Sequence, residues 1–129
     1  MEKNVSFLTA FNNQMDNFLD DLIIVCPNET EFSMLKNAIM LVKKTNPRII
    51  INQFNEMIIP YKEQLLLRNE SFFIVKDFHD DFTSVSSDYI SKVTNKLKSI
   101  WESGLTNDDK VKIWDYFQSL ISLAELANK

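Results

Sequence analysis

Apolar residues in the segment 105–126 recur at helical spacing and cover a wide arc. On a helical wheel they fill nearly half of the circumference, and they are Ile113, Trp114, Tyr116, Phe117, Leu120, Ile121, Leu123, Ala124 and Ala127. An ordinary surface helix has an apolar stripe of roughly 100°. The segment is therefore predicted to be a helix that packs against two or more neighbours, or that keeps one face for a partner. Thr106 is its predicted N-cap, with Asp108 and Asp109 in the first turn.

The segment 6–24 has the most regular helical pattern in the chain. Its apolar residues alternate at spacings of three and four, and they are Leu8, Phe11, Met15, Phe18, Leu19, Leu22 and Val25. The polar residues between them, Asn12 and Asp16 included, are predicted to face water. A coiled-coil seam is compatible with this pattern, but the pattern stops at Pro27. A helix inside a compact bundle is the favoured interpretation.

Prolines mark the next boundaries along the chain. Pro27 ends the first helix, and Asn28 with Glu31 resembles a capping box that opens a second helix. Asn46 and Pro47 are predicted to be the N-cap and first residue of a third helix. Its apolar stripe continues in phase beyond the next proline, which indicates a kink or a very short break.

Between residues 70 and 83 the pattern is ambiguous. Residues 72–75 are strand-like, but no second strand-like run exists to pair with them, so we expect an extended or single-turn connector whose aromatic residues fill the bundle. Ser86, Ser87 and Asp88 are candidate caps of a helix that follows. Gly104 is predicted to end that helix in a left-handed conformation.

Composition favours an all-α protein. The chain has 129 residues, 45% hydrophobic and 25% charged, with one glycine and three prolines, too few for the many turns of a sandwich or barrel. We therefore predict one domain over residues 1–129, a single compact bundle of five to six antiparallel helices with a central C-terminal helix. The longest apolar run is too short to span a membrane, and the N-terminus lacks a secretion signal. Residence in the cytoplasm or a virion is expected, without secretion or membrane association.

Catalytic and metal-binding groups are sparse. Cys26 is the only cysteine, and a single glycine excludes a glycine-rich phosphate loop. His79 lies among Asp77, Asp80 and Asp81, but the chain offers no second histidine to complete a ligand set. A metal-dependent enzyme around His79 is accordingly the least favoured hypothesis. No catalytic residue, cofactor or metal is predicted.

Two groups of basic residues could contact phosphate. The first contains Lys43, Lys44 and Arg48, and the second contains Lys92 and Lys96. Phosphate contacts of this kind are electrostatic and depend on salt. Because the net charge is −4, a solvated surface is favoured over a nucleic-acid site, which stays the alternative.

Some aromatic and apolar residues could instead form a partner surface. Phe72 and Phe73 lie in the ambiguous connector, and Tyr116 and Leu123 extend the wide apolar arc of the C-terminal segment. Packing in the core is the usual role of such residues. Aromatic residues on an irregular connector are nevertheless well placed for recognition.

Several short motifs carry a resemblance over nearly the whole chain. They are Phe11-Asn12-Asn13, Asn46-Pro47, Pro60-Tyr61, Phe72-Phe73, Lys76-Asp77 and Ile113-Trp114-x-Tyr116-x-Gln118. With them the chain resembles small helical proteins encoded by large nucleocytoplasmic DNA viruses of algae and protists. The resemblance implies a viral origin and brings no activity or catalytic residue. The expected function is non-enzymatic, through contacts with a viral or host protein or a second copy, with nucleic-acid binding as the alternative.

Overall fold

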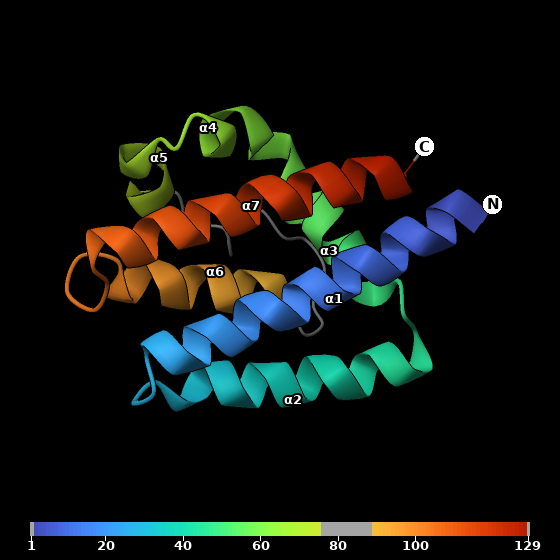
Figure 1. The fold of residues 1–129 in the computed structure, drawn as a ribbon. Helices are drawn as coiled ribbons and strands as arrows, with labels where there is room; N and C mark the ends of the chain where they lie inside the picture. Colours follow the sequence, from blue (N-terminus) through green and yellow to red (C-terminus); the bar gives the residue numbers. More distant parts are fainter. Residues whose placement is uncertain (1, 76–88, 129) are drawn as a thin grey trace.

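The computed structural model describes residues 2–75 and 89–128, and these form an all-α fold without strands (Figure 1). The all-α prediction is thus confirmed. In chain order the elements are α1 (Glu2–Val25), α2 (Thr30–Thr45), α3 (Ile49–Met57), the 3₁₀ turn η1 (Ile59–Tyr61), α4 (Lys62–Leu66), α5 (Glu70–Val75), α6 (Tyr89–Ile100) and α7 (Asn107–Ala127).

The two longest helices, α1 and α7, run antiparallel and pack against each other (Figure 1). α2 lies on the other side of α1 and forms one edge of the molecule, and α4 lies on the other side of α7. α3 contacts α1, α6 and α7. Because α7 has neighbours on several sides, its wide apolar arc is covered as predicted, and its central position is confirmed.

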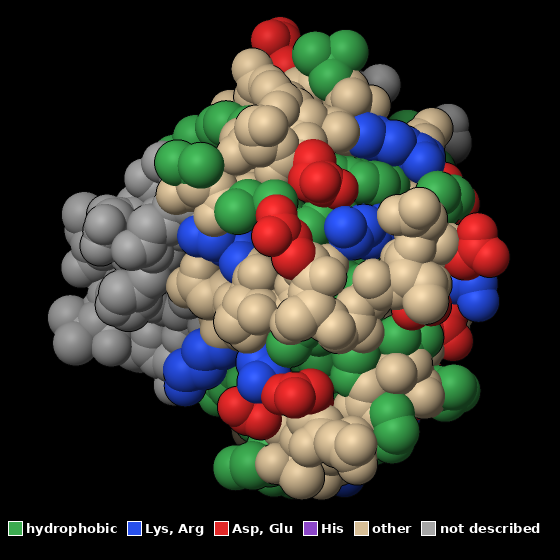
Figure 2. Space-filling model, turned by 90° about the vertical axis from the view of Figure 1, so that its left-hand side faces the viewer, with side chains coloured by type: hydrophobic (Ala, Val, Ile, Leu, Met, Phe, Trp, Pro, Cys, Tyr) green, Lys and Arg blue, Asp and Glu red, His purple; other side chains and the backbone are tan. Residues whose placement is uncertain are grey.

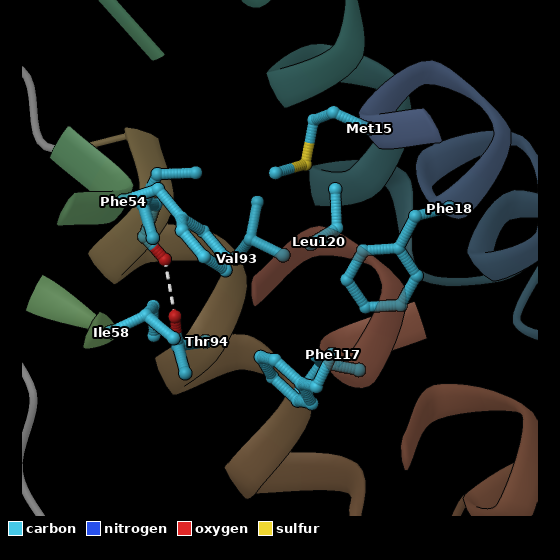
Figure 3. A pocket seen from close by; sticks show the side chains of 10 residues that line it. Met15, Phe18, Phe54, Ile58, Val93, Thr94, Phe117 and Leu120 are labelled. Carbon is cyan, nitrogen blue, oxygen red and sulfur yellow. Dashed lines mark hydrogen bonds between the residues drawn. The ribbon is translucent and has the colours of Figure 1, made fainter. Parts of the chain in front are cut away.

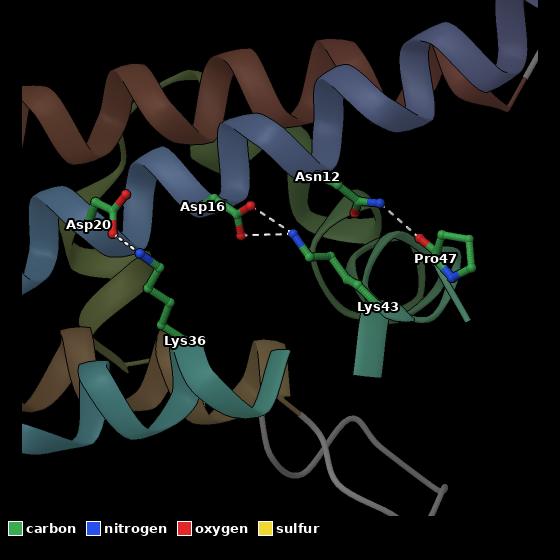
Figure 4. Close-up of polar contacts among 6 residues, drawn as sticks. All are labelled: Asn12, Asp16, Asp20, Lys36, Lys43 and Pro47. Carbon is green, nitrogen blue, oxygen red and sulfur yellow. Dashed lines mark hydrogen bonds and ion pairs between the residues drawn. The ribbon is translucent and has the colours of Figure 1, made fainter. Parts of the chain in front are cut away.

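The apolar stripe of α1 is buried as predicted except for Val25, which is partly buried, and one polar residue is buried with the stripe. Asn12 was expected to face water, and that prediction is wrong. The start of α3 comes against α1 there, and the Asn12 side-chain amide donates to the carbonyl oxygen of Pro47 at 2.9 Å (Figure 4). A long-range backbone partner thus compensates the burial of this amide.

The starts of α2 and α3 differ from the predicted caps. α2 begins after Glu29 without a side-chain cap, so the predicted capping box of Asn28 and Glu31 is absent. Both Glu29 and Glu31 instead pair with Lys96 of α6. Asn46 ends α2 and accepts a hydrogen bond from the Arg48 backbone at 3.0 Å, so α3 starts a few residues later than predicted.

The predicted break at Pro60 is confirmed, because η1 separates α3 from α4 there. Residues 70–75 were predicted to be an extended or single-turn connector, and in the structure they form the short helix α5. Its Phe73 is fully buried, so this aromatic residue fills the bundle as expected. Residues 76–83, His79 and the caps predicted at residues 86–88 lie outside the described residues.

In the connection between α6 and α7, the prediction for Gly104 is wrong and the prediction for the Thr106 cap is confirmed. The left-handed conformation predicted for Gly104 is wrong, since its φ is not positive. A Cβ there would lie 3.2 Å from both the Cβ and the carbonyl oxygen of Ile100, so close approach to α6 explains the glycine. The capping prediction for α7 is confirmed: Thr106 and Asp109 form a reciprocal capping box.

An aromatic cluster lies where α5, α6 and α7 meet. Phe73 packs against Trp101, Trp114 and Phe117, with ring centroids 5.0 to 5.8 Å apart. Trp101 and Trp114 also meet edge to face at 5.3 Å. These separations are those of favourable aromatic pairs, so the cluster ties the small helix α5 to the body of the bundle.

Candidate functional site

The outward face of α2 is the clearest candidate for an interaction surface. While Phe32, Leu35 and Ile39 are buried, the opposite face exposes Met34 and Leu41, which are 67% and 65% exposed. Spacings of three and four residues align five exposed positions there, which we call the α2 outer stripe: Thr30, Met34, Asn37, Leu41 and Thr45. At 100° per residue these five fall within an arc of about 80°.

The α2 outer stripe contains no charged residue, although a quarter of the chain is charged. Lys44 and Met40, both exposed, lie beside it. Solvent-exposed apolar side chains that cluster on one face often mark contact sites. The flexible thioether of methionine adapts easily to a partner surface. This stripe was missed in the sequence analysis, where only the buried stripe of the helix was considered; the spacing of seven between Met34 and Leu41 was the available signal.

A second group of exposed apolar residues lies near α4, α5 and α7. It contains Leu66, Leu67, Val75 and Val111. Charged pairs interrupt it, because Arg68 binds Asp115 at 2.5 Å and Lys110 lies 3.7 Å from Glu70. Figure 2, which views this end of the molecule, shows hydrophobic side chains interspersed with charged ones. This region is therefore a mixed surface, unlike the uncharged α2 outer stripe.

The residues predicted to form a partner surface are not brought together. Phe73 is 0% exposed and is therefore a core residue, which corrects the prediction for it. Phe72 packs on Tyr61 with ring centroids 5.6 Å apart. Tyr116, by contrast, stacks on Phe18 of α1 at 4.9 Å. Leu123 is partly buried against the core.

An open hollow of about 320 Å³ lies between α1 and α7. Its lining is polar, and consists of Gln14, Asp21, Lys112, Asp115, Tyr116 and Ser119. Burial, together with a hydrogen bond donated to Asp21, raises the pKa of Tyr116 to about 12. Tyr116 therefore stays protonated near neutral pH and acts as a hydrogen-bond donor, which makes it unsuitable as a general base.

An apolar gap in the interior is too small for a ligand. This cavity of about 10 Å³ lies among Met15, Phe54, Val93, Phe117 and neighbouring side chains (Figure 3). Such a volume matches about one water molecule. The hydroxyl of Thr94, the polar group at its wall, already donates to the carbonyl oxygen of Ile90. The cavity is thus a packing gap.

Reactive and metal-ligating groups give no site among the described residues. Burial raises the pKa of the Cys26 thiol, so the nucleophilic thiolate is disfavoured. No cluster of three or more potential metal ligands occurs in the described part of the chain. His79, with Asp77, Asp80 and Asp81, lies outside that part.

The basic residues predicted to contact phosphate occupy different situations. Lys43 binds both carboxylate oxygens of Asp16, at 2.8 and 2.9 Å (Figure 4), and Lys96 pairs with Glu29 and Glu31. Lys92 lies over the ring of Tyr89, 6.0 Å from its centroid.

The other two basic residues are Lys44 and Arg48, which are exposed where α2 leads into α3. Neither side chain forms an ion pair with any residue that the structure describes. A phosphate would compete with carboxylates at Lys43 and Lys96, whereas no carboxylate of the described residues competes at Lys44 and Arg48. Lys44 and Arg48 are therefore the strongest remaining candidates for phosphate contact, which stays a prediction.

Comparison of the chain with protein-family models, with curated proteins and with solved structures finds no match. No helix among residues 2–75 and 89–128 is long and apolar enough to cross a lipid bilayer. Among the surfaces of the described residues, the α2 outer stripe stands out as an exposed helix face whose five positions carry no charge.

Proposed function

We propose that this chain is a non-enzymatic protein that acts by binding other protein chains. The observation that carries the proposal is the α2 outer stripe, five exposed and uncharged positions on one helix face that include Met34 and Leu41. Burying these side chains against a partner would release about 25 cal/mol for each Å² of apolar area removed from water. The proposed setting, a virion or the cytoplasm of a virus-infected host, rests on the resemblance to proteins of large DNA viruses.

Paired variants test this proposal. The double substitution Met34→Glu/Leu41→Glu places two charges on the stripe, and Leu67→Glu/Val111→Glu places two on the other exposed apolar group. Each chain is used to capture proteins from the cells that naturally produce it, and each captured protein is then purified and its affinity measured. We expect to find a partner that binds the wild type and the control variant Leu67→Glu/Val111→Glu equally well. The same partner should bind Met34→Glu/Leu41→Glu at least about tenfold more weakly. Equal binding of all three chains by every partner would contradict the proposal.

Nucleic-acid binding is the alternative function, and Lys44 with Arg48 is the pair that favours it. If this pair contacts phosphate, the affinity for a nucleic acid should fall steeply with salt, and Lys44→Ala/Arg48→Ala should flatten that dependence. A fluorescence anisotropy titration at low and moderate salt measures both effects. Absence of binding at low salt would remove this alternative.

A further inference from the structure

We infer that the α2 outer stripe pairs with the same stripe of a second copy of this chain, with the two α2 helices antiparallel. This inference rests on the proposed function, since it names the partner of the same surface. A two-fold axis would pass between Asn37 and Ala38.

Four of the five residues of the stripe lie symmetrically about that point, and the fifth, Asn37, lies next to it. Met34 and Leu41 are equally far from the midpoint between Asn37 and Ala38, and so are Thr30 and Thr45. In an antiparallel pair, Met34 of one chain would therefore lie level with Leu41 of the second copy. An interface with two-fold symmetry requires a patch that complements itself in this way, because each residue meets its counterpart twice.

Charge also favours antiparallel self-association. The stripe itself is uncharged, so two copies approach without repulsion between like side chains. The charged residues that flank the stripe near its two ends are Glu31, which also pairs with Lys96 of α6, and Lys44, on the opposite side; the two are equally far from the same midpoint. An antiparallel pair places Glu31 level with Lys44 of the second copy, whereas a parallel pair would place like charges level with each other. Antiparallel helix dipoles are favourable as well.

The position of α2 leaves the stripe accessible. α2 forms an edge of the molecule in Figure 1, and its contacts with α1, α3 and α6 use the buried side. A helix of 16 residues is about 24 Å long. One helix pair of this length buries less than the roughly 800 Å² per partner of a standard interface. The dimer is therefore weak, with a dissociation constant in the micromolar to millimolar range.

The first test measures the mass of the purified protein in solution as its concentration rises. Sedimentation equilibrium from about 10 μM to 1 mM covers the expected range. The wild type and Leu67→Glu/Val111→Glu should both move from the mass of one chain toward that of two. Met34→Glu/Leu41→Glu adds two negative charges, as the control variant does, but places them on the α2 outer stripe. This variant should dimerise at least about tenfold more weakly than the wild type. Circular dichroism checks that all three chains are folded. We expect that they are, because all the substituted residues are exposed in the wild type.

The second test determines the register by disulfide formation. Asn37→Cys lies next to the two-fold axis, so this variant should form a cross-linked dimer with itself under mild oxidation. Thr30→Cys should cross-link only when mixed with Thr45→Cys, because disulfides need Cα atoms about 4.4–6.8 Å apart. The native thiol, Cys26, is buried and serves as the background control in the unsubstituted chain. Self-cross-linking of Thr30→Cys without that of Asn37→Cys would overturn the antiparallel arrangement.

The outcomes separate this inference from the proposed function. A wild-type chain that stays monomeric at every concentration overturns the dimer, as does a dimer that the α2 substitutions leave unchanged. In either case the proposed function still stands if the α2 substitutions abolish binding of a different protein. A dimer lost on α2 substitution, with the expected cross-links, supports both.

Discussion

Phe72 and Phe73 are neighbours in the chain but have different environments. Phe73 points into the aromatic cluster and is fully buried, whereas Phe72 is partly exposed beside Tyr61. A short helix separates them by about 100°, which turns one side chain inward and leaves the other at the surface. From sequence, both residues were predicted to lie on the same possible partner surface. Until the helix is known, the sequence does not show which of two adjacent aromatic side chains faces the core.

This difference predicts unequal effects of truncation. Phe73→Ala removes a fully buried ring and should lower the free energy of unfolding by about 3–5 kcal/mol. Phe72→Ala is the matched control, and should cost about 1 kcal/mol because its ring is already partly in water. Urea denaturation followed by circular dichroism measures both values. Equal losses would contradict the insertion of α5 into the cluster.

Trp114 tests the same cluster from α7. It contacts Phe73, Trp101 and Phe117 and is almost completely buried. Trp114→Ala should therefore lower the free energy of unfolding by about 3–5 kcal/mol. Val111→Ala, at an exposed position of the same helix, should have little effect. A loss for Trp114→Ala no larger than that of the control would place α7 at the surface instead of the centre.

At the scale of elements, the start of α7 depends on its cap. The Thr106 hydroxyl accepts from the Asp109 backbone at 3.1 Å, and the Asp109 carboxylate accepts from the Thr106 backbone at 3.0 Å. Thr106→Ala removes half of this exchange and should cost about 1 kcal/mol. Asn107→Ala, at the next position, lacks the capping role and should be nearly neutral. Chemical denaturation of both variants distinguishes capping from a general effect of alanine.

The contact between α1 and α7 should respond to alkaline pH through Tyr116. Burial and the hydrogen bond to Asp21 raise its pKa from 10.0 to about 12, so the unfolded chain loses this proton first. The stabilisation from Tyr116 is complete below pH 10 and is lost between about pH 10 and 12. Unfolding of the wild type and of Tyr116→Phe should be compared at several pH values across this window.

The difference in stability between these two chains should shrink as pH rises. In an Asp21→Asn background the change should be smaller, because the carboxylate that opposes ionisation is gone. A difference that stays constant from pH 9 to 12 would show that the tyrosine titrates alike in both states.

Periodic elements were predictable from sequence, and local exceptions were not. The buried stripes of α1 and α7 follow from apolar spacing, because burial of a continuous helix face dominates the choice of orientation. Asn12 departs from its pattern since its partner, the Pro47 carbonyl, comes from a distant turn. Glu31 likewise pairs with Lys96 of α6 instead of capping its own helix. Both cases depend on tertiary contacts that no local window contains.

The candidate site was less predictable than the fold. The spacing of seven between Met34 and Leu41 reveals a second apolar stripe on α2, but it does not tell whether another helix covers that stripe or solvent does. Only the packing of α2 at an edge of the molecule assigns the second stripe to solvent. The basic residues raise the same difficulty, because charge alone cannot tell Lys43, which is paired, from Lys44, which is not paired with any described residue.

At the scale of the whole molecule, the aromatic cluster should report global unfolding. Trp101 and Trp114 both lie in it, on α6 and α7. If the bundle unfolds as one cooperative unit, tryptophan fluorescence and far-ultraviolet circular dichroism should give the same urea midpoint. Both signals can be recorded on the same samples. Separate midpoints would mean that the region around the cluster unfolds independently of the other helices.

The pairing of α1 with α7 also affects how the chain is synthesised. Gln14 of α1 donates a hydrogen bond to Ser119 of α7, 105 residues further along the chain. These two helices share the most extensive contact among the described elements. On the ribosome, α1 is made first among the described helices and α7 last. The apolar stripe of α1 must therefore wait, covered only in part by α2, until translation reaches its main partner. High sequence separation of this kind slows folding, so the nascent chain is a stage at which chaperone binding would matter most.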